Sequence, residues 1–219
     1  MTYTGHVVPG GPVDVRTLGR ATIRKMSVSG MNNNVYLLTC AETGEQLLVD
    51  AADEAPRCLD LVREGSGRLD HLLTTHRHWD HVRALEDVAR ATGATTYAGA
   101  DDADALPLVP DVRLRHGDVV TVGVLELDVI HLRGHTPGSI ALSWVDPDDG
   151  SHLFTGDSLF PGGHGRTTAP EDHLSLMDDL EERVFGVLPD DTFFYPGHGD
   201  NSTLGAERPS LAEWRARGW

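Results

Sequence analysis

The apolar positions along the chain fall mainly in short runs and alternate with polar ones, a pattern that predicts a strand-rich protein. Strand-like runs occupy 21–28, 34–40, 46–51, 69–76, 95–99, 139–146, 152–160 and 192–199, and the alternation over 117–134 predicts a hairpin. Apolar spacing of about 3.6 residues predicts helices over 55–65, 80–93 and 171–188. Strands and helices in this order favour two sheets with helices outside over a single doubly wound sheet.

The length and composition are typical of one domain with its own core. Of 219 residues, 39% are hydrophobic and 24% are charged. Residues 1–20 are rich in glycine, proline and polar residues, so we expect a loose arm there and a single domain over 21–219. The sequence contains no apolar run of about 18 residues, so a membrane-spanning helix is not expected. The polar start lacks an apolar signal core, which predicts a cytoplasmic protein.

The charge of the chain narrows the choice of partner. The formal net charge is −16, and so acidic a surface repels phosphate backbones. Nucleic acid and anionic membranes are therefore not expected partners. The partner that we expect is a small-molecule substrate. The oligomeric state stays open. Cys40 and Cys58 are isolated and lack CxxC spacing, so each is expected to be a buried small side chain.

Three histidines and an aspartate lie within six positions of the segment THRHWDH, directly after a predicted strand. In an extended segment alternate side chains point the same way, so His76 and His78 can bind one ion. Asp80 and His81 turn the chain toward the following helix, and they can serve a second ion. Imidazole and carboxylate groups suit zinc, iron and related ions.

Three further motifs each follow a predicted strand. GHTPGS contains His135, FTGDSLF contains Asp157 and PGHGD contains His198. Loops at strand ends can converge on one edge of a sandwich, where binding sites are common. Two ions would need one more histidine each and a carboxylate between them, and these three residues are of the right types. The sequence therefore predicts a metal site.

Together, THRHWDH, GHTPGS, FTGDSLF and PGHG resemble the metallo-β-lactamase superfamily, and most of all hydroxyacylglutathione hydrolase (glyoxalase II) and its short relatives. The resemblance runs from about Asn32 to Glu207 and implies a four-layer αββα sandwich with a dinuclear metal site at one edge. It implies a first metal held by His76, His78 and His135, a second held by Asp80, His81 and His198, and a bridging Asp157. Asp50, in LLVDA, would support the metal loop. The implied cofactors are two divalent ions, zinc first, with iron or manganese as alternatives.

The resemblance predicts a metallo-hydrolase that cleaves a thioester or related ester with a metal-bound hydroxide. Metal ions lower the pKa of bound water toward 7, and the chain lacks a G-x-S-x-G or Cys/His nucleophile signature. Asp80 could also accept or orient a proton. Because 21 residues follow His198, we expect no helical C-terminal domain of the kind that grips glutathione in full-length glyoxalase II, and the thiol carrier stays open.

Three alternatives stay open beside this hypothesis. The scaffold also resembles mononuclear iron persulfide dioxygenases, in which His76, His135 and Asp157 would hold the iron. A lactonase and a non-catalytic metal-binding protein are the others. The complete set for a second metal favours the dinuclear hydrolase, and the acidic charge argues against the nuclease branch of the superfamily.

Overall fold

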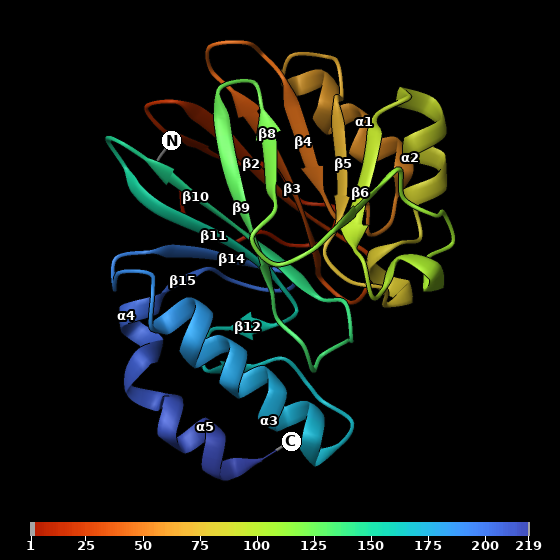
Figure 1. Cartoon of the computed structure of the whole chain (residues 1–219). Helices are drawn as coiled ribbons and strands as arrows, with labels where there is room; N and C mark the ends of the chain where they lie inside the picture. Colours follow the sequence, from red (N-terminus) through yellow and green to blue (C-terminus); the bar gives the residue numbers. More distant parts are fainter. Residues whose placement is uncertain (1–2, 219) are drawn as a thin grey trace.

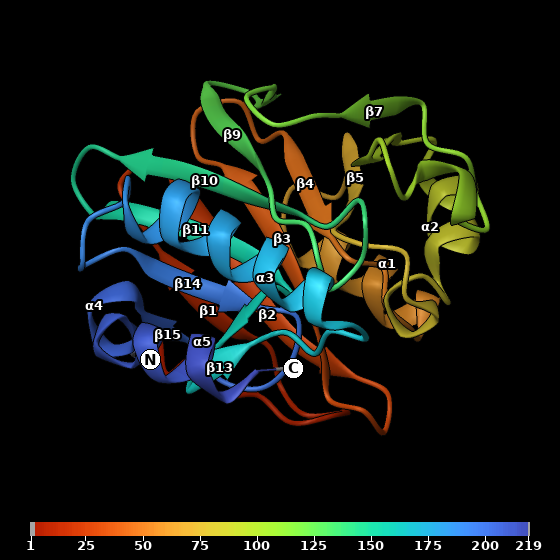
Figure 2. The same ribbon diagram turned by 60° about the horizontal axis from the view of Figure 1, so that its bottom comes forward.

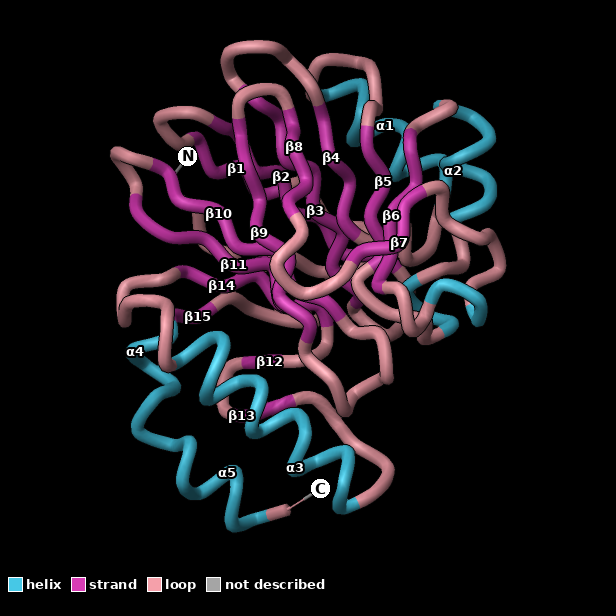
Figure 3. The backbone as a smooth tube through the Cα atoms, in the orientation of Figure 1, coloured by secondary structure: helices cyan, strands magenta, loops and turns pink. Residues whose placement is uncertain are grey.

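Two β-sheets pack face to face between two layers of helices (Figure 1). This arrangement is seen in a computed structural model, which describes residues 3–218. It confirms the predicted four-layer αββα sandwich. Figure 3 shows the strands gathered in the middle of the molecule and the helices on two sides.

The first sheet has seven strands in sequence order. They are β1 (Asp14–Thr17), β2 (Ala21–Val28), β3 (Asn33–Cys40), β4 (Gln46–Val49), β5 (His71–Thr74), β6 (Thr95–Gly99) and β7 (Val112–Leu114). The strands from β1 to β4 are antiparallel, and those from β4 to β7 are parallel. The carboxyl ends of β4, β5 and β6 therefore share one edge with the beginning of β3.

The second sheet has six strands in the order β15-β14-β11-β10-β9-β8. They are β8 (Val119–Val122), β9 (Leu125–His131), β10 (Ile140–Asp146), β11 (Gly150–Gly156), β14 (Phe193–Pro196) and β15 (Ser202–Thr203). β9 and β11 are both antiparallel to β10, and β14 is parallel to β11. All three strands therefore end at the same edge. A small hairpin of β12 (Leu159–Phe160) and β13 (Gly163–His164) follows β11.

Each sheet buries its outer face under helices. Apolar residues of α1 (Ala55–Glu64) and α2 (Leu85–Thr92) form one cluster with the first sheet. On the other side, α3 (Pro170–Asp179), the π-helical turn Leu180–Phe185, α4 (Leu204–Glu207) and α5 (Leu211–Arg217) pack on the second sheet. Figure 2 shows α3 lying across β11 and β14. Within the described chain, no helix is both long enough and apolar enough to cross a membrane.

The core between the sheets explains the apolar runs in the sequence. Leu38 and Leu73 of the first sheet belong to one buried cluster with Leu127, Leu142 and Phe154 of the second. Central strands such as β3 are covered on both faces, so their residues are almost all buried. The aromatic rings of Tyr36 and Phe154 meet edge to face across this interface, 5.5 Å between centroids.

The predicted strands and the helix over 55–65 are confirmed, with ends that differ by a few residues. The helix predicted over 80–93 is wrong in its first part, because Trp79–His81 form a 3₁₀ turn and α2 begins only at Leu85. The backbone N–H groups of Arg83 and Ala84 donate to carbonyls of Ala52 and Ala51 instead of to a helical turn. This pairing ties the segment to the loop after β4.

Two further differences concern the ends of elements. The helix predicted over 171–188 ends as an α-helix at Asp179 and continues as the π-helical turn. Within residues 1–20, residues 14–17 pair with β2 as strand β1, and the division into arm and domain stays a prediction. The sequence patterns did not predict β1, β7, α4 or α5.

Candidate metal centre

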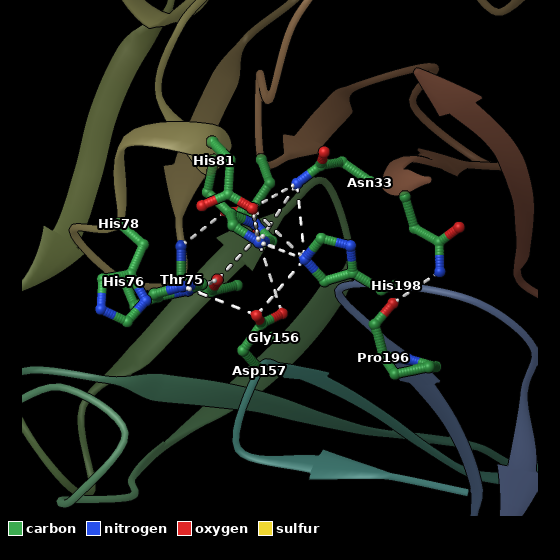
Figure 4. Close-up of polar contacts among 12 residues, drawn as sticks. Asn33, Thr75, His76, His78, His81, Gly156, Asp157, Pro196 and His198 are labelled. Carbon is green, nitrogen blue, oxygen red and sulfur yellow. Dashed lines mark hydrogen bonds and ion pairs between the residues drawn. The ribbon is translucent and has the colours of Figure 1, made fainter. Parts of the chain in front are cut away.

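The seven residues predicted from the sequence come together at the shared edge of the two sheets. The segment after β5 contributes His76, His78, Asp80 and His81. The second sheet contributes His135 after β9, Asp157 after β11 and His198 after β14. Figure 4 shows His76 and His78 on one side of Asp157 and His198 on the other. Their role as metal ligands stays a prediction.

Three histidines form the first triad, which we define as His76, His78 and His135. One nitrogen of each ring lies within 4.8 Å of the others. His78 Nδ1 and His135 Nε2 are 2.9 Å apart. His76 Nε2 is buried and has no hydrogen-bond partner among residues 3–218. A buried nitrogen lone pair without a partner is costly in an apolar site, and a metal ion would satisfy it.

Asp80, His81 and His198 form the second triad. His81 Nε2 lies 3.1 Å from His198 Nε2, and His198 Nε2 lies 3.4 Å from Asp80 Oδ2. Asn33, the first residue of β3, donates from Nδ2 to Asp80 Oδ2 at 2.9 Å. Two imidazole nitrogens and a carboxylate oxygen thus face a common point, an oxygen and nitrogen set that zinc and iron accept.

Asp157 lies between the two triads. Its Oδ2 is 3.7 Å from His135 Nε2 and 3.4 Å from His198 Nε2, and its Oδ1 is 3.3 Å from His81 Nε2. Gly197 makes this approach possible, because a Cβ there would lie 2.1 Å from Asp157 Oδ1. One carboxylate therefore contacts histidines of both triads.

Hydrogen bonds behind the rings fix which nitrogen faces the centre. His198 Nδ1 donates to the carbonyl of Met31 at 2.9 Å, and His135 Nδ1 donates to the carbonyl of Arg166 at 2.8 Å. Each of these two rings therefore presents Nε2 with its lone pair to the centre when the imidazole is neutral.

Asp50 also holds rings of the centre from behind, as the resemblance implied. Its Oδ2 accepts from His81 Nδ1 at 2.9 Å and from the Thr75 hydroxyl at 2.7 Å, while Oδ1 accepts from the Thr75 backbone N–H. The Thr75 oxygen in turn accepts from His76 Nδ1 at 3.0 Å. Asp50, His76 and His81 also lie close enough together to form a metal-binding group. Because both Asp50 oxygens already accept hydrogen bonds, we interpret Asp50 as a support for the rings and not as a ligand.

The pKa values of the histidines shift in opposite directions in the two triads. Burial lowers the pKa of His76 well below its ordinary value, and it also lowers the pKa of His78 and His135. Burial has the same tendency at His81, but the hydrogen bonds to Asp157 and Asp50 outweigh it and raise the pKa to about 10. The hydrogen bond to Asp157 likewise raises the pKa of His198 against the effect of burial.

Sequence reasoning missed buried polar residues that support the centre, among them Asn33 and Asp102. Asn33 lies in a run of three asparagines that gave no signal of its own. Asp102 follows β6 and hydrogen-bonds to the loops of His78 and His135. Its place at the carboxyl end of a parallel strand, beside those of Asp50 and His76, was a usable signal.

Comparisons with known proteins agree with this geometry. The sequence profile described as "Metallo-beta-lactamase superfamily" matches residues 28–198. The hydroxyacylglutathione hydrolase of Cereibacter sphaeroides is 39% identical over 170 residues, which cover 76% of this chain and 62% of that protein. The chain thus spans less than two thirds of this relative's length.

Two solved structures are also similar. ETHE1 from Myxococcus xanthus superimposes with a TM-score of 0.77 at 30% identity, covering 89% of this chain and 84% of that one. TTHA1623, whose structure is of a di-iron-bound form, gives a TM-score of 0.69 at 31% identity and covers 83% and 95%.

The fold, the histidine and aspartate cluster and the sequence profile define the class: the chain belongs to the metallo-β-lactamase superfamily. Within that superfamily it is similar to hydroxyacylglutathione hydrolases and is glyoxalase II-like. Membership implies divalent metal ions, and the two triads provide suitable donor atoms for them.

Proposed function

We propose that the protein is a metal-dependent hydrolase with a dinuclear centre, and that it cleaves a thioester or a related ester. The first triad would hold one metal ion, the second triad would hold the other, and Asp157 would bridge them. The observation that carries the proposal is the position of Asp157, whose carboxylate contacts histidines of two adjacent triads. The di-iron form of the similar TTHA1623 structure supports two ions.

Divalent ions in such a centre supply a hydroxide nucleophile at neutral pH and polarise a carbonyl group. The chain's own residues set the geometry. The carbonyls of Met31 and Arg166 orient His198 and His135, and Asp50 orients His81. Asp80, held by Asn33, has an oxygen at the centre, where it could also accept a proton during turnover. Zinc is the proposed metal, because mixed imidazole and carboxylate sites suit it.

The substrate class rests on the relatives. The name hydroxyacylglutathione hydrolase refers to a glutathione thioester, and we propose a thioester for this chain also. A mononuclear iron centre of His76, His135 and Asp157 is the alternative, and those three side chains do lie together, with His76 Nε2 4.0 Å and His135 Nε2 3.7 Å from Asp157 Oδ2. The complete second triad beside them favours the dinuclear hydrolase.

The first experiment is elemental analysis of protein purified without added metal, followed by assays on a hydroxyacylglutathione thioester, a simple acyl thioester and a lactone. We expect about two divalent ions per chain and thioester turnover that stops when a chelator removes them. About one iron per chain without thioester turnover would favour the mononuclear alternative. A protein that binds no metal even after reconstitution would contradict both.

A further inference from the structure

Asp102 is a buried carboxylate outside both triads that contacts the two loops of the first triad. Its side chain is 1% exposed, and it follows β6. Oδ2 accepts from the backbone N–H of Arg77 at 2.9 Å and from the hydroxyl of Thr136 at 2.5 Å. Oδ1 accepts from the backbone N–H of Gly138 at 2.9 Å. One carboxylate thus holds three donors from two loops.

The two loops are those that deliver the first triad. Arg77 stands between His76 and His78, and Thr136 follows His135 directly. The loops come from different sheets, after β5 and after β9, and they meet where His78 Nδ1 and His135 Nε2 are 2.9 Å apart. A shared acceptor behind this meeting point fixes one loop relative to the other.

The backbone around Asp102 is packed with no spare room. A Cβ on Gly138 would lie 2.2 Å from the Asp102 nitrogen, and a Cβ on Gly99 would lie 1.9 Å from the Gly138 carbonyl oxygen. Only glycine at these two positions lets the segment after β6 lie against the His135 loop. The carboxylate therefore has a fixed position relative to both loops, as a positioning group needs.

We propose that Asp102 is a positioning residue of the first triad, which keeps His78 and His135 at the spacing that a metal ion requires. The inference rests on the proposed metal centre, but not on the nature of the substrate. A charged carboxylate suits the role because all three of its partners are donors, and hydrogen bonds to an ionised acceptor are stronger than neutral ones.

The test is Asp102→Asn, which keeps the size of the side chain. The amide nitrogen would face an N–H or O–H donor on at least one side, so at least one loop would lose a hydrogen bond to this side chain. We expect the affinity of the first triad for Zn²⁺ to fall by roughly 10–100-fold, the usual effect of losing support behind a metal ligand, with the second triad unchanged. Competition with a chelator measures both zinc affinities. The variants His135→Ala and His198→Ala, each of which disrupts one triad, show which affinity belongs to which triad. Co²⁺ absorption of the first triad should shift as well.

Asp146→Asn is the matched control. Asp146 is also 1% exposed and accepts three backbone N–H bonds, from Arg20, Asp148 and Asp149, at the far end of β10. The Asp146→Asn variant should have lower thermal stability than the wild-type protein and unchanged zinc affinities at both triads. If Asp102→Asn does not fold, Thr136→Val removes one donor to Asp102, and we expect about a threefold to tenfold loss at the first triad alone.

The proposal would be overturned if Asp102→Asn, or Thr136→Val in its place, kept both zinc affinities, or weakened both triads equally. Failure of the proposed function is a separate result, because the wild-type protein would then bind less than two metal ions or bind two without thioester turnover. The zinc and cobalt measurements on the variants do not depend on turnover.

Discussion

The two triads lie next to each other and share Asp157, yet they differ in the charge they carry without metal. The first triad consists of three imidazoles whose pKa values burial lowers, so they are neutral at pH 7. In the second triad the pKa of His81 is raised to about 10 and that of His198 is raised as well. The cause is hydrogen bonding to carboxylates, because Asp157 and Asp50 both bond to His81 and Asp157 bonds to His198.

The two halves of one metal centre therefore differ in the protonation of their histidines before metal binds. The neutral first triad offers imidazole lone pairs, including that of His76 Nε2, which has no hydrogen-bond partner in the part of the chain that the structure describes. In the second triad the raised pKa values of His81 and His198 favour protonated rings, and a metal ion would replace a proton there. Metal binding at the first triad should therefore depend little on pH, whereas binding at the second should depend on it strongly.

Removing the shared carboxylate should weaken metal binding at both triads. Asp157→Ala takes away a carboxylate that contacts histidines of both triads, and losing one partner of a buried charged contact costs about 4 kcal/mol, or roughly a thousandfold in affinity. We expect both zinc affinities to fall by about this factor in a chelator competition, and thioester turnover to be lost with them.

Asp146→Ala is the control for this variant, since it removes an equally buried carboxylate away from the centre. It should keep two zinc ions. A loss confined to one triad in Asp157→Ala would show that Asp157 does not bridge.

The pH dependence of metal binding should separate the triads without any substitution. A histidine with a raised pKa keeps its proton at pH 7, so metal must displace that proton, and affinity falls as the pH is lowered. Between pH 6.5 and 8 we expect the affinity of the second triad to rise at least tenfold per pH unit, which corresponds to the release of at least one proton per metal ion. The first triad, with pKa values lowered from 6.5, should show almost no slope.

Calorimetric titration of zinc in two buffers of different ionisation enthalpy measures the protons released at each step. Equal proton release at both steps would contradict the assignment of charge to the triads. His198→Ala, which removes part of the second triad alone, should abolish the step that depends on pH and leave the other step in place.

The difference between the triads also bears on what could be predicted from the sequence. Four of the seven residues stand within THRHWDH, and the other three each follow a strand that alternation predicted, so residue type and strand ends were enough to find them. The same periodicity predicted two sheets with helices outside, and the resemblance to the superfamily implied the four-layer αββα sandwich. The opposite pKa shifts of the two triads could not be predicted, because they depend on distances between side chains from different strands, such as His81 to Asp50.

Supporting residues were missed for a related reason. Lys25 and Asp102 act through backbone carbonyl and N–H groups of loops that lie far away in the sequence. Such contacts leave no motif, because any residue can offer its backbone. The helix predicted from residue 80 failed similarly, since the N–H groups of Arg83 and Ala84 bond to the carbonyls of Ala52 and Ala51 after β4.

Lys25 gives the second triad a support that mirrors Asp102 in the first. It is fully buried in β2, and its Nζ donates to the carbonyls of Gly199 at 2.7 Å and Gly5 at 2.6 Å, and to Asn201 Oδ1 at 2.8 Å. Burial lowers its pKa to about 8, so it is still charged at pH 7. A cation thus fixes the loop of His198 through carbonyl oxygens, whereas an anion fixes the loops of His78 and His135 through N–H and O–H donors.

Replacing Lys25 should therefore affect the triad that Asp102 does not. Lys25→Met keeps the length of the side chain and removes its donors, but the Gly199 carbonyl keeps a second bond, from Asn34 Nδ2 at 2.9 Å. We expect only about a fivefold loss of zinc affinity at the second triad, the worth of one hydrogen bond, with the first triad unchanged. Arg24→Met is the control: it removes a cation from the adjacent position of β2, whose side chain bonds to Thr39, and it should change neither affinity. A Lys25→Met protein that instead lost zinc from the first triad would mean that the two loops are not anchored independently.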